Sequence, residues 1–204
     1  MDNKRTVLQN SVYEIEVKHS RFIGCAFPVK SVDEANATIA SIRAEHRKAR
    51  HNVYAYIIGS NTGYSDDGEP KKTAGLPIYD YLRKEELTDV LVVVTRYFGG
   101  ILLGTGGLVK AYTDAAKGAV EAAVPAKVER CELYKFETDY GTAERLRAQI
   151  TDYTVDIEVE YTDKISITVT VLKENAAKLI KEATEILKTN DYEYLGERDI
   201  TVKQ

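Results

Sequence analysis

The stretch that decides the fold of this 204-residue sequence is Val90-Leu-Val-Val-Val-Thr95-Arg96-Tyr97-Phe98-Gly99-Gly100-Ile-Leu-Leu-Gly104-Thr105-Gly106-Gly107-Leu-Val-Lys110-Ala-Tyr112. Its first five residues are apolar without a break, which is typical of a strand buried on both faces. Five glycines follow within nine residues, and glycine reaches backbone conformations that are closed to other residues. After Gly106, apolar residues recur every three or four positions. The stretch therefore predicts a strand, a glycine-rich loop and a helix.

A strand, a glycine-rich loop and a helix N-terminus can together hold an anion, because free N–H groups and the helix dipole point toward it. The glycines can equally serve a tight bend where a helix packs close to a sheet, and the spacing leaves both interpretations open. The loop is not a nucleoside-triphosphate loop, since Thr105 stands where that motif needs a lysine. It also lacks the G-x-G-x-x-G fingerprint of dinucleotide-binding folds directly after the strand.

The composition is that of an ordinary globular protein, with 44% hydrophobic residues. A chain of 204 residues suffices for one large or two small domains. Cys25 and Cys131 have no metal or redox spacing, which predicts buried thiols in a reducing cytosol. No apolar stretch follows the first residues, so we expect no signal peptide, no membrane association and a cytoplasmic location.

The charge distribution excludes a strongly basic domain. Residues 1–125 carry 16 Lys and Arg against 15 Asp and Glu, a net of +1, and residues 126–204 carry 12 against 17, a net of −5. Any contact with nucleic acid must therefore rest on a local patch. One basic cluster, from Arg43 to His51, closes a predicted helix. Its charge either matches the helix dipole in solvent or faces a phosphate.

The first 125 residues alternate strands and helices. We expect strands over residues 12–18, 21–29 and 53–59, and helices over about 31–42 and 76–87. The capping-box spacing of Ser31 and Glu34 predicts the start of the first helix.

A polar segment after the strand at 53–59 ends in the acidic loop, residues 66–73, which reads Asp66-Asp67-Gly68-Glu69-Pro70-Lys71-Lys72-Thr73. Its three carboxylates lie within four residues. Such a group can bind a hard cation through oxygen ligands or transfer protons in catalysis. Asp, Gly and Pro are also turn formers, and composition alone favours a plain turn.

Pro125 ends the long helix and marks the predicted boundary between domains at 1–125 and 126–204. Beyond it the predicted order is strand, helix, strand, strand, helix, strand, the ferredoxin-like split βαβ arrangement. The ranges are 128–138, 140–150, 153–160, 164–172, 174–188 and 192–202. The short connection Tyr161-Thr162-Asp163 predicts a hairpin between the two middle strands. This half contains no histidine and no metal-ligand spacing.

Two signatures together resemble the IMPACT family, in its bacterial YigZ-type branch. They are Asp66-Asp67-Gly68-Glu69-Pro70 with Thr73-Ala74-Gly75-Leu76-Pro77, and the run from Val93 to Tyr112. The resemblance implies an α+β protein, with an N-terminal α/β domain like the second domain of a ribosomal protein and a C-terminal ferredoxin-like βαββαβ domain. Eukaryotic relatives bind a ribosome-associated activator of the amino-acid-starvation kinase. The bacterial branch is suspected of binding nucleic acid or the ribosome.

Two positions depart from the pattern of the family. Lys71 and Lys72 stand where Ser-Gly is usual, which makes this turn stiffer and more basic. Lys110 stands where arginine is commoner, and it keeps the charge but loses the planar fork of a guanidinium. Both departures alter the phosphate geometry that the resemblance implies.

The sequence thus predicts a non-enzymatic protein that binds RNA, the ribosome or a ribosome-associated protein and regulates translation or a stress response. The predicted nucleic-acid or anion-binding residues are Lys71, Lys72, Arg96, Gly99, Gly100, Gly104, Gly106, Gly107 and Lys110. The predicted supporting residues are Asp66, Asp67, Glu69 and Thr73. We expect no catalytic residue, no metal and no cofactor.

Two other functions stay open. The carboxylates of the acidic loop could instead be metal ligands of a metal-assisted hydrolase or phosphotransferase. In a purely structural role, Asp66 or Asp67 would pair with Arg96, because a charge at the end of a buried strand needs a partner to offset its desolvation. Tyr97 and Phe98 could stack on unpaired bases or belong to the core.

Overall fold

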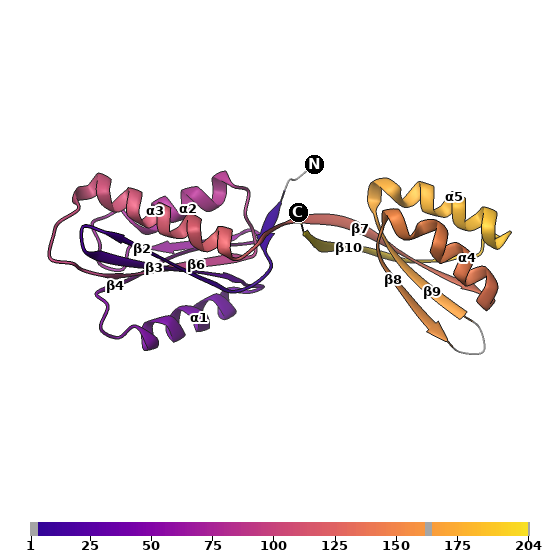
Figure 1. The fold of residues 1–204 in the computed structure, drawn as a ribbon, viewed down its shortest axis with the longest axis horizontal. Helices are drawn as coiled ribbons and strands as arrows, with labels where there is room; N and C mark the ends of the chain where they lie inside the picture. Colours follow the sequence, from indigo (N-terminus) through magenta and orange to yellow (C-terminus); the bar gives the residue numbers. More distant parts are fainter. Residues whose placement is uncertain (1–3, 162–164, 204) are drawn as a thin grey trace. The chain divides into compact units, whose positions relative to one another are not determined.

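The computed structural model describes residues 4–161 and 165–203 of the chain, which form a mixed α+β structure (Figure 1). These residues make two sheets of five strands each and five α-helices. Residue contacts divide the chain into two compact units, Met1–Val128 with Thr201–Gln204, and Glu129–Ile200. The predicted α+β class is confirmed.

The sheet of the first unit has the order β2-β3-β6-β4-β5, and each neighbouring pair is antiparallel. Its strands are β2 (Ser11–Val17), β3 (Ser20–Pro28), β6 (Val90–Tyr97), β4 (His51–Ile58) and β5 (Asn61–Ser65). β6 lies at the centre of the sheet, and its first seven residues are all buried. The buried strand predicted at 90–94 is confirmed, and it continues to Tyr97.

Helices cover both faces of this sheet, α1 on one face and α2 with α3 on the other (Figure 1). Val90, Val92 and Val94 of β6 pack with α2 and α3, whereas Leu91 and Val93 pack with α1. Each position of the strand therefore needs an apolar side chain, which is why the run does not alternate. The helices are α1 (Val32–Glu45), α2 (Gly75–Lys84) and α3 (Gly104–Ala122).

Local signals set the ends of these helices. The hydroxyl of Ser31 accepts a hydrogen bond from the N–H of Glu34 at 3.1 Å, which confirms the predicted start of α1. α3 begins at Gly104, earlier than the start expected after Gly106. Its middle lies close to β3, where a Cβ at Gly24 would collide with the carbonyl of Ala115. A side chain at that position would push the helix off the sheet.

Two short strands escape prediction from the sequence, β1 (Arg5–Val7) and β5. β1 pairs with residues Pro125–Lys127, and β5 pairs with β4 at the edge of its sheet. β5 can be short and polar because only one side of this edge strand joins the ladder, whereas β1 has only three residues, too few to show a pattern. The local sequence therefore carries no apolar pattern for either strand.

The elements of the second half follow the predicted order. They are β7 (Pro125–Thr138), α4 (Tyr140–Ile150), β8 (Thr154–Tyr161), β9 (Ile165–Leu172), α5 (Ala176–Leu187) and β10 (Glu193–Lys203). β9 pairs with β7 and β8, and β10 pairs with β7, as in a ferredoxin-like domain. Residues 162–164, the centre of the predicted hairpin connection, lie outside the described residues. The predicted boundary after residue 125 stays a prediction, and β7 begins at Pro125.

Candidate functional site

Asp66 closes the acidic loop through backbone hydrogen bonds. Its carboxylate accepts from the N–H groups of Lys72 at 2.8 Å, Ala74 at 3.1 Å and Gly75 at 2.8 Å. The last two residues begin α2, whose N-cap Ala74 has no side-chain hydrogen bond of its own. Asp66 therefore caps α2 from outside the helix, where a carboxylate also suits the positive end of the helix dipole.

Asp67 ties the acidic loop to α1 and β4. Its Oδ1 accepts from Arg43 at 2.8 Å, and its Oδ2 accepts from the N–H of Asn52 at 2.6 Å. Nδ1 of His51 lies 2.8 Å from the carbonyl oxygen of Asp67, and because a carbonyl only accepts, Nδ1 carries the proton. Asp67 and Gly68 have φ of +41° and +86°, so the chain turns sharply here.

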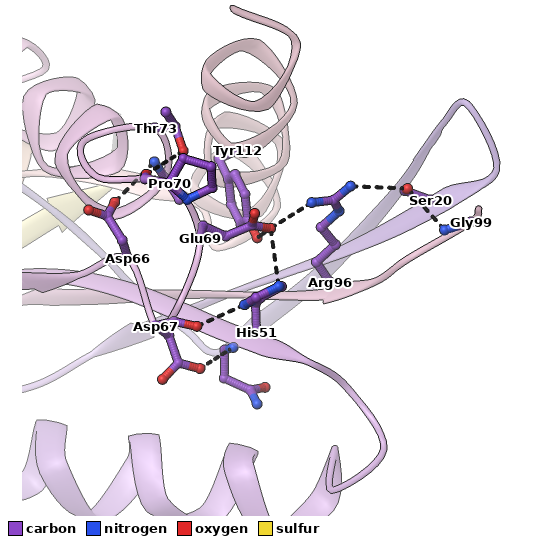
Figure 2. A network of polar contacts seen from close by, with 12 residues as sticks. Ser20, His51, Asp66, Asp67, Glu69, Pro70, Thr73, Arg96, Gly99 and Tyr112 are labelled. Carbon is purple, nitrogen blue, oxygen red and sulfur yellow. Dashed lines mark hydrogen bonds and ion pairs between the residues drawn. The ribbon is translucent and has the colours of Figure 1, made fainter. Parts of the chain in front are cut away.

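Glu69 is the buried carboxylate of the acidic loop, with a side chain 4% exposed. Its Oε1 accepts from Nη1 of Arg96 and from the hydroxyl of Tyr112, each at 2.7 Å (Figure 2). Nη2 of Arg96 donates to the Ser20 hydroxyl at 3.5 Å, and that hydroxyl accepts from the N–H of Gly99 at 3.1 Å. Burial and the bond to Glu69 raise the pKa of Tyr112, which keeps its hydroxyl a donor. The network joins β3, β6, α3 and the acidic loop.

The predicted pairing of Arg96 with Asp66 or Asp67 is wrong, because the partner of Arg96 is Glu69. The chain turns sharply at Asp67 and Gly68, and the side chain of Glu69 therefore leaves the loop in a different direction from those of Asp66 and Asp67. Asp66 and Asp67 are bonded to the loop, α1 and β4, and Glu69 alone reaches β6 (Figure 2). The buried arginine has a carboxylate partner, as its desolvation requires.

The three carboxylates of the acidic loop do not converge on one point, since each is bonded to different protein donors. Thr73 also closes the loop, because it is buried and donates its hydroxyl proton to the carbonyl of Pro70 at 2.7 Å. Within the part of the chain that the structure describes, no group of three or more His, Cys, Asp or Glu side chains could hold a metal ion. The geometry therefore gives no support to the metal-assisted hydrolase or phosphotransferase.

The buried ion pair carries one unsatisfied donor. Nε of Arg96 is buried and has no hydrogen-bond partner among the described residues. A buried donor without a partner costs about 1–3 kcal/mol. Glu69 and Ser20 thus hold the guanidinium of Arg96 in place, and its Nε–H stays available as a hydrogen-bond donor to a ligand.

A cavity of about 420 Å³ adjoins this network. Its lining includes Arg50, His51, Glu69, Arg96 and the first residues of α3. No side chain caps the N-terminus of α3, and the first N–H groups of a helix have no partner within it. The cavity therefore brings two guanidinium groups and the positive end of a helix dipole together.

The structure places the predicted anion-binding residues in different surroundings. Arg96 and Gly104 line the cavity of 420 Å³, whereas Lys72 lines a second cavity of about 780 Å³ along α2 and α3. Lys110 is exposed on α3 and pairs with Asp114 at 2.8 Å. Lys71 is exposed in the acidic loop. The predicted anion-binding residues therefore do not line one common cavity.

The glycines have separate roles. A Cβ at Gly99 would collide with the backbone of the turn before β3, and Gly100 and Gly104 have φ of +87° and +75°, which favour glycine. These three serve the tight bend. Gly106 and Gly107 lie in the first turns of α3, and a Cβ at Gly106 would meet nothing within 4 Å. The bend therefore accounts for the first three glycines and leaves Gly106 unexplained.

The structure distinguishes the two aromatic residues beside Arg96. Tyr97 packs against the core under α1, and its hydroxyl lies 2.9 Å from Nδ1 of His46. Phe98 is 45% exposed and lines the cavity, with the guanidinium of Arg96 5.5 Å from its ring centroid. Of the pair, Phe98 is the residue that a ligand can reach.

Sequence reasoning missed two contributors to this region, Ser20 and Tyr112, and left open whether the basic cluster with Arg50 and His51 faces solvent or a phosphate. Arg50 and His51 belong to the basic cluster, and they reach the cavity because β4 pairs with β6, with His51 opposite Arg96. Ser20 and Tyr112 hold the network through partners distant in the sequence. A buried tyrosine needs a hydrogen-bond partner, and this is the signal that could have marked Tyr112.

The fold and the site define a class of two-unit α+β proteins in which an acidic turn fixes a buried arginine beside a glycine-rich helix start. The family model described as the Impact N-terminal domain matches residues 18–120, about half of the chain. The chain belongs to the IMPACT family.

Two curated relatives and one solved structure extend the match. An IMPACT family member of Haemophilus influenzae is 42% identical over 154 residues, which cover 72% of this chain and 73% of the relative. YigZ of Escherichia coli is 40% identical over 130 residues, 61% of this chain and 64% of YigZ, less than two thirds of its length. A crystal structure described as that of a hypothetical protein is 29% identical and covers 96% of this chain and 98% of its own, with a TM-score of 0.60. No helix in residues 4–161 and 165–203 is long and apolar enough to cross a membrane.

Proposed function

We propose that this protein is a non-enzymatic RNA-binding protein that binds RNA free or within ribosomal particles. The observation that supports it most is the set of groups around one cavity: the exposed ring of Phe98, the guanidinium of Arg50 and the uncapped N-terminus of α3. Cationic groups and helix N–H groups suit a phosphate, and an exposed aromatic ring suits an unpaired base. Single-stranded RNA offers both.

The state of the carboxylates supports binding over catalysis. A general acid or base needs a proton within reach of a substrate, and a metal site needs carboxylate oxygens that converge. Asp66, Asp67 and Glu69 are instead engaged by backbone N–H groups, arginines and a tyrosine hydroxyl. Their role is to hold the acidic loop and Arg96 in place.

Binding of labelled single-stranded RNA, followed by fluorescence anisotropy at several salt concentrations, tests the proposal. Five cations near the acidic loop and the end of α1 have no carboxylate partner among the described residues: Arg47, Lys48, Arg50, Lys71 and Lys72. Roughly three to five phosphate contacts give a log–log salt slope of about −2 to −3.5 for single strands. Lys71→Ala with Lys72→Ala should flatten that slope by about 1 to 1.5.

Co-sedimentation with ribosomal particles tests the finer part of the proposal, that the RNA is ribosomal and that the protein regulates translation or a stress response. Binding to purified RNA and to particles supports it. Binding to particles alone would instead favour a ribosome-associated protein as the partner. If wild-type protein binds neither at low salt, RNA binding is refuted.

A further inference from the structure

We infer that the cavity beside Arg96 takes a single ribonucleoside monophosphate unit. The unit is either the end of an RNA chain or a free nucleotide, and for the first source the inference rests on the proposed function. The volume of about 420 Å³ lies in the lower part of the range of about 300–1,000 Å³ for small-molecule sites. That size suits one nucleotide better than a run of nucleotides.

The first set of lining groups matches the phosphate. Gly104 and Thr105 begin α3 and line the cavity, and no side chain caps the helix. Arg50 lines the same space, is exposed and has no carboxylate partner in the described part of the chain. Arg96 also lines it, with a side chain only 6% exposed and an Nε–H that has no partner. Uncapped N–H groups, the guanidinium of Arg50 and the unpartnered Nε–H of Arg96 attract the negatively charged oxygens of a phosphate group.

The second set of lining groups matches the ribose. Since Nδ1 of His51 donates to the carbonyl of Asp67, Nε2 is the ring nitrogen that a ligand meets in the cavity, and in the tautomer with a single proton it is an acceptor. Nε2 lies 3.9 Å from Oε1 of Glu69, so in that tautomer two acceptors face each other. The cis-hydroxyl groups of a ribose supply the donors that this arrangement needs. A deoxyribose lacks the 2′-hydroxyl, so the site should distinguish RNA from DNA.

The third set of lining groups matches the base. Phe98 and Leu102 are 45% and 82% exposed, and Pro70 is exposed as well, although all three line the cavity. A base stacked on the ring of Phe98 would cover this apolar surface. The carboxylate of Glu69 does not repel the phosphate strongly, because Arg96 and Tyr112 already neutralise and bond it.

Four probes test the inference on the full-length protein: a linear single-stranded RNA, a circular RNA of the same sequence, the corresponding linear DNA, and the free nucleotides AMP and UMP as competitors. Linear RNA should bind about 3–10-fold more tightly than DNA, the difference expected for one lost hydrogen bond. Linear RNA should also bind more tightly than circular RNA, and AMP or UMP should compete with it.

Variants assign the effects to the cavity. His51→Asn keeps an N–H donor for the carbonyl of Asp67 and removes the Nε2 acceptor, so the preference for RNA over DNA should fall toward one. Arg50→Ala should weaken nucleotide competition about tenfold, because a charge-assisted contact is lost. Lys30→Ala is the control, since this exposed cation of the same unit does not line the cavity, and it should change competition less than about twofold.

The outcomes separate this inference from the proposed function. Equal binding of linear RNA, circular RNA and DNA, without competition by AMP or UMP, overturns the nucleotide site and leaves RNA binding intact. Binding of AMP or UMP by a protein that binds no RNA supports the site as one for free nucleotides and refutes the proposed function. Binding of no probe overturns both.

Discussion

Replacing Arg96 with Met should strongly destabilise the protein, because it leaves the buried carboxylate of Glu69 without its cation. The two side chains are 6% and 4% exposed, and Nη1 lies 2.7 Å from Oε1. Removing one partner of a buried ion pair costs about 3–5 kcal/mol. In a chain of this length about 1 kcal/mol corresponds to 2–4 °C in Tm, so Tm should fall by about 6–20 °C.

Arg43→Met is the matched control, since Arg43 pairs with Asp67 of the same acidic loop at 2.8 Å. Those side chains are 45% and 27% exposed, and such a pair contributes about 0.2–1 kcal/mol. Its Tm should therefore fall by less than about 4 °C in differential scanning calorimetry at pH 7. Arg96→Met combined with Glu69→Leu should recover part of the loss, because the unpaired charge is gone. Equal Tm values for Arg96→Met and Arg43→Met would refute the reasoning.

Three further predictions concern the same unit. Asp66→Ala removes the acceptor of three backbone N–H groups and should cost about 1–3 kcal/mol in urea unfolding, and a loss below about 0.5 kcal/mol would contradict its capping role. The raised pKa of Tyr112 stabilises the fold below about pH 10, and this stabilisation is lost as pH rises above that value, because the tyrosine then releases its proton in the unfolded state first. Between pH 10 and 11 the free energy of unfolding should therefore decline less steeply in Tyr112→Phe than in the wild type, by up to about 1.4 kcal/mol per pH unit. An unchanged slope would argue against burial of the hydroxyl. Gly24→Ala should destabilise the protein by more than about 1 kcal/mol, because the added Cβ collides with α3. Gly106→Ala should be neutral or stabilise by up to about 1 kcal/mol, because its Cβ meets nothing within 4 Å. Similar thermal shifts for both variants would contradict the packing argument.

The sequence by itself determined the elements whose cause is local. The apolar run at 90–94 predicts a strand buried on both faces, since each face of β6 lies on a helical layer. The spacing of Ser31 and Glu34 predicts the start of α1, because the two groups that meet are three residues apart. Hydrophobic periodicity also predicts α4 over 140–150 and the βαββαβ order of the second half. Neighbouring residues alone decide these features.

Only the tertiary structure decided which carboxylate holds Arg96 and what surrounds the cavity. Asp66, Asp67 and Glu69 each offer a carboxylate within four residues, and the backbone turn at Asp67 and Gly68 sends Glu69 alone to β6. Arg50 lines the same cavity as the N-terminus of α3 because β4 is registered against β6, and that register follows from burying the apolar faces of the whole sheet. A contact between segments far apart in the chain depends on how every layer packs, and no local pattern encodes it.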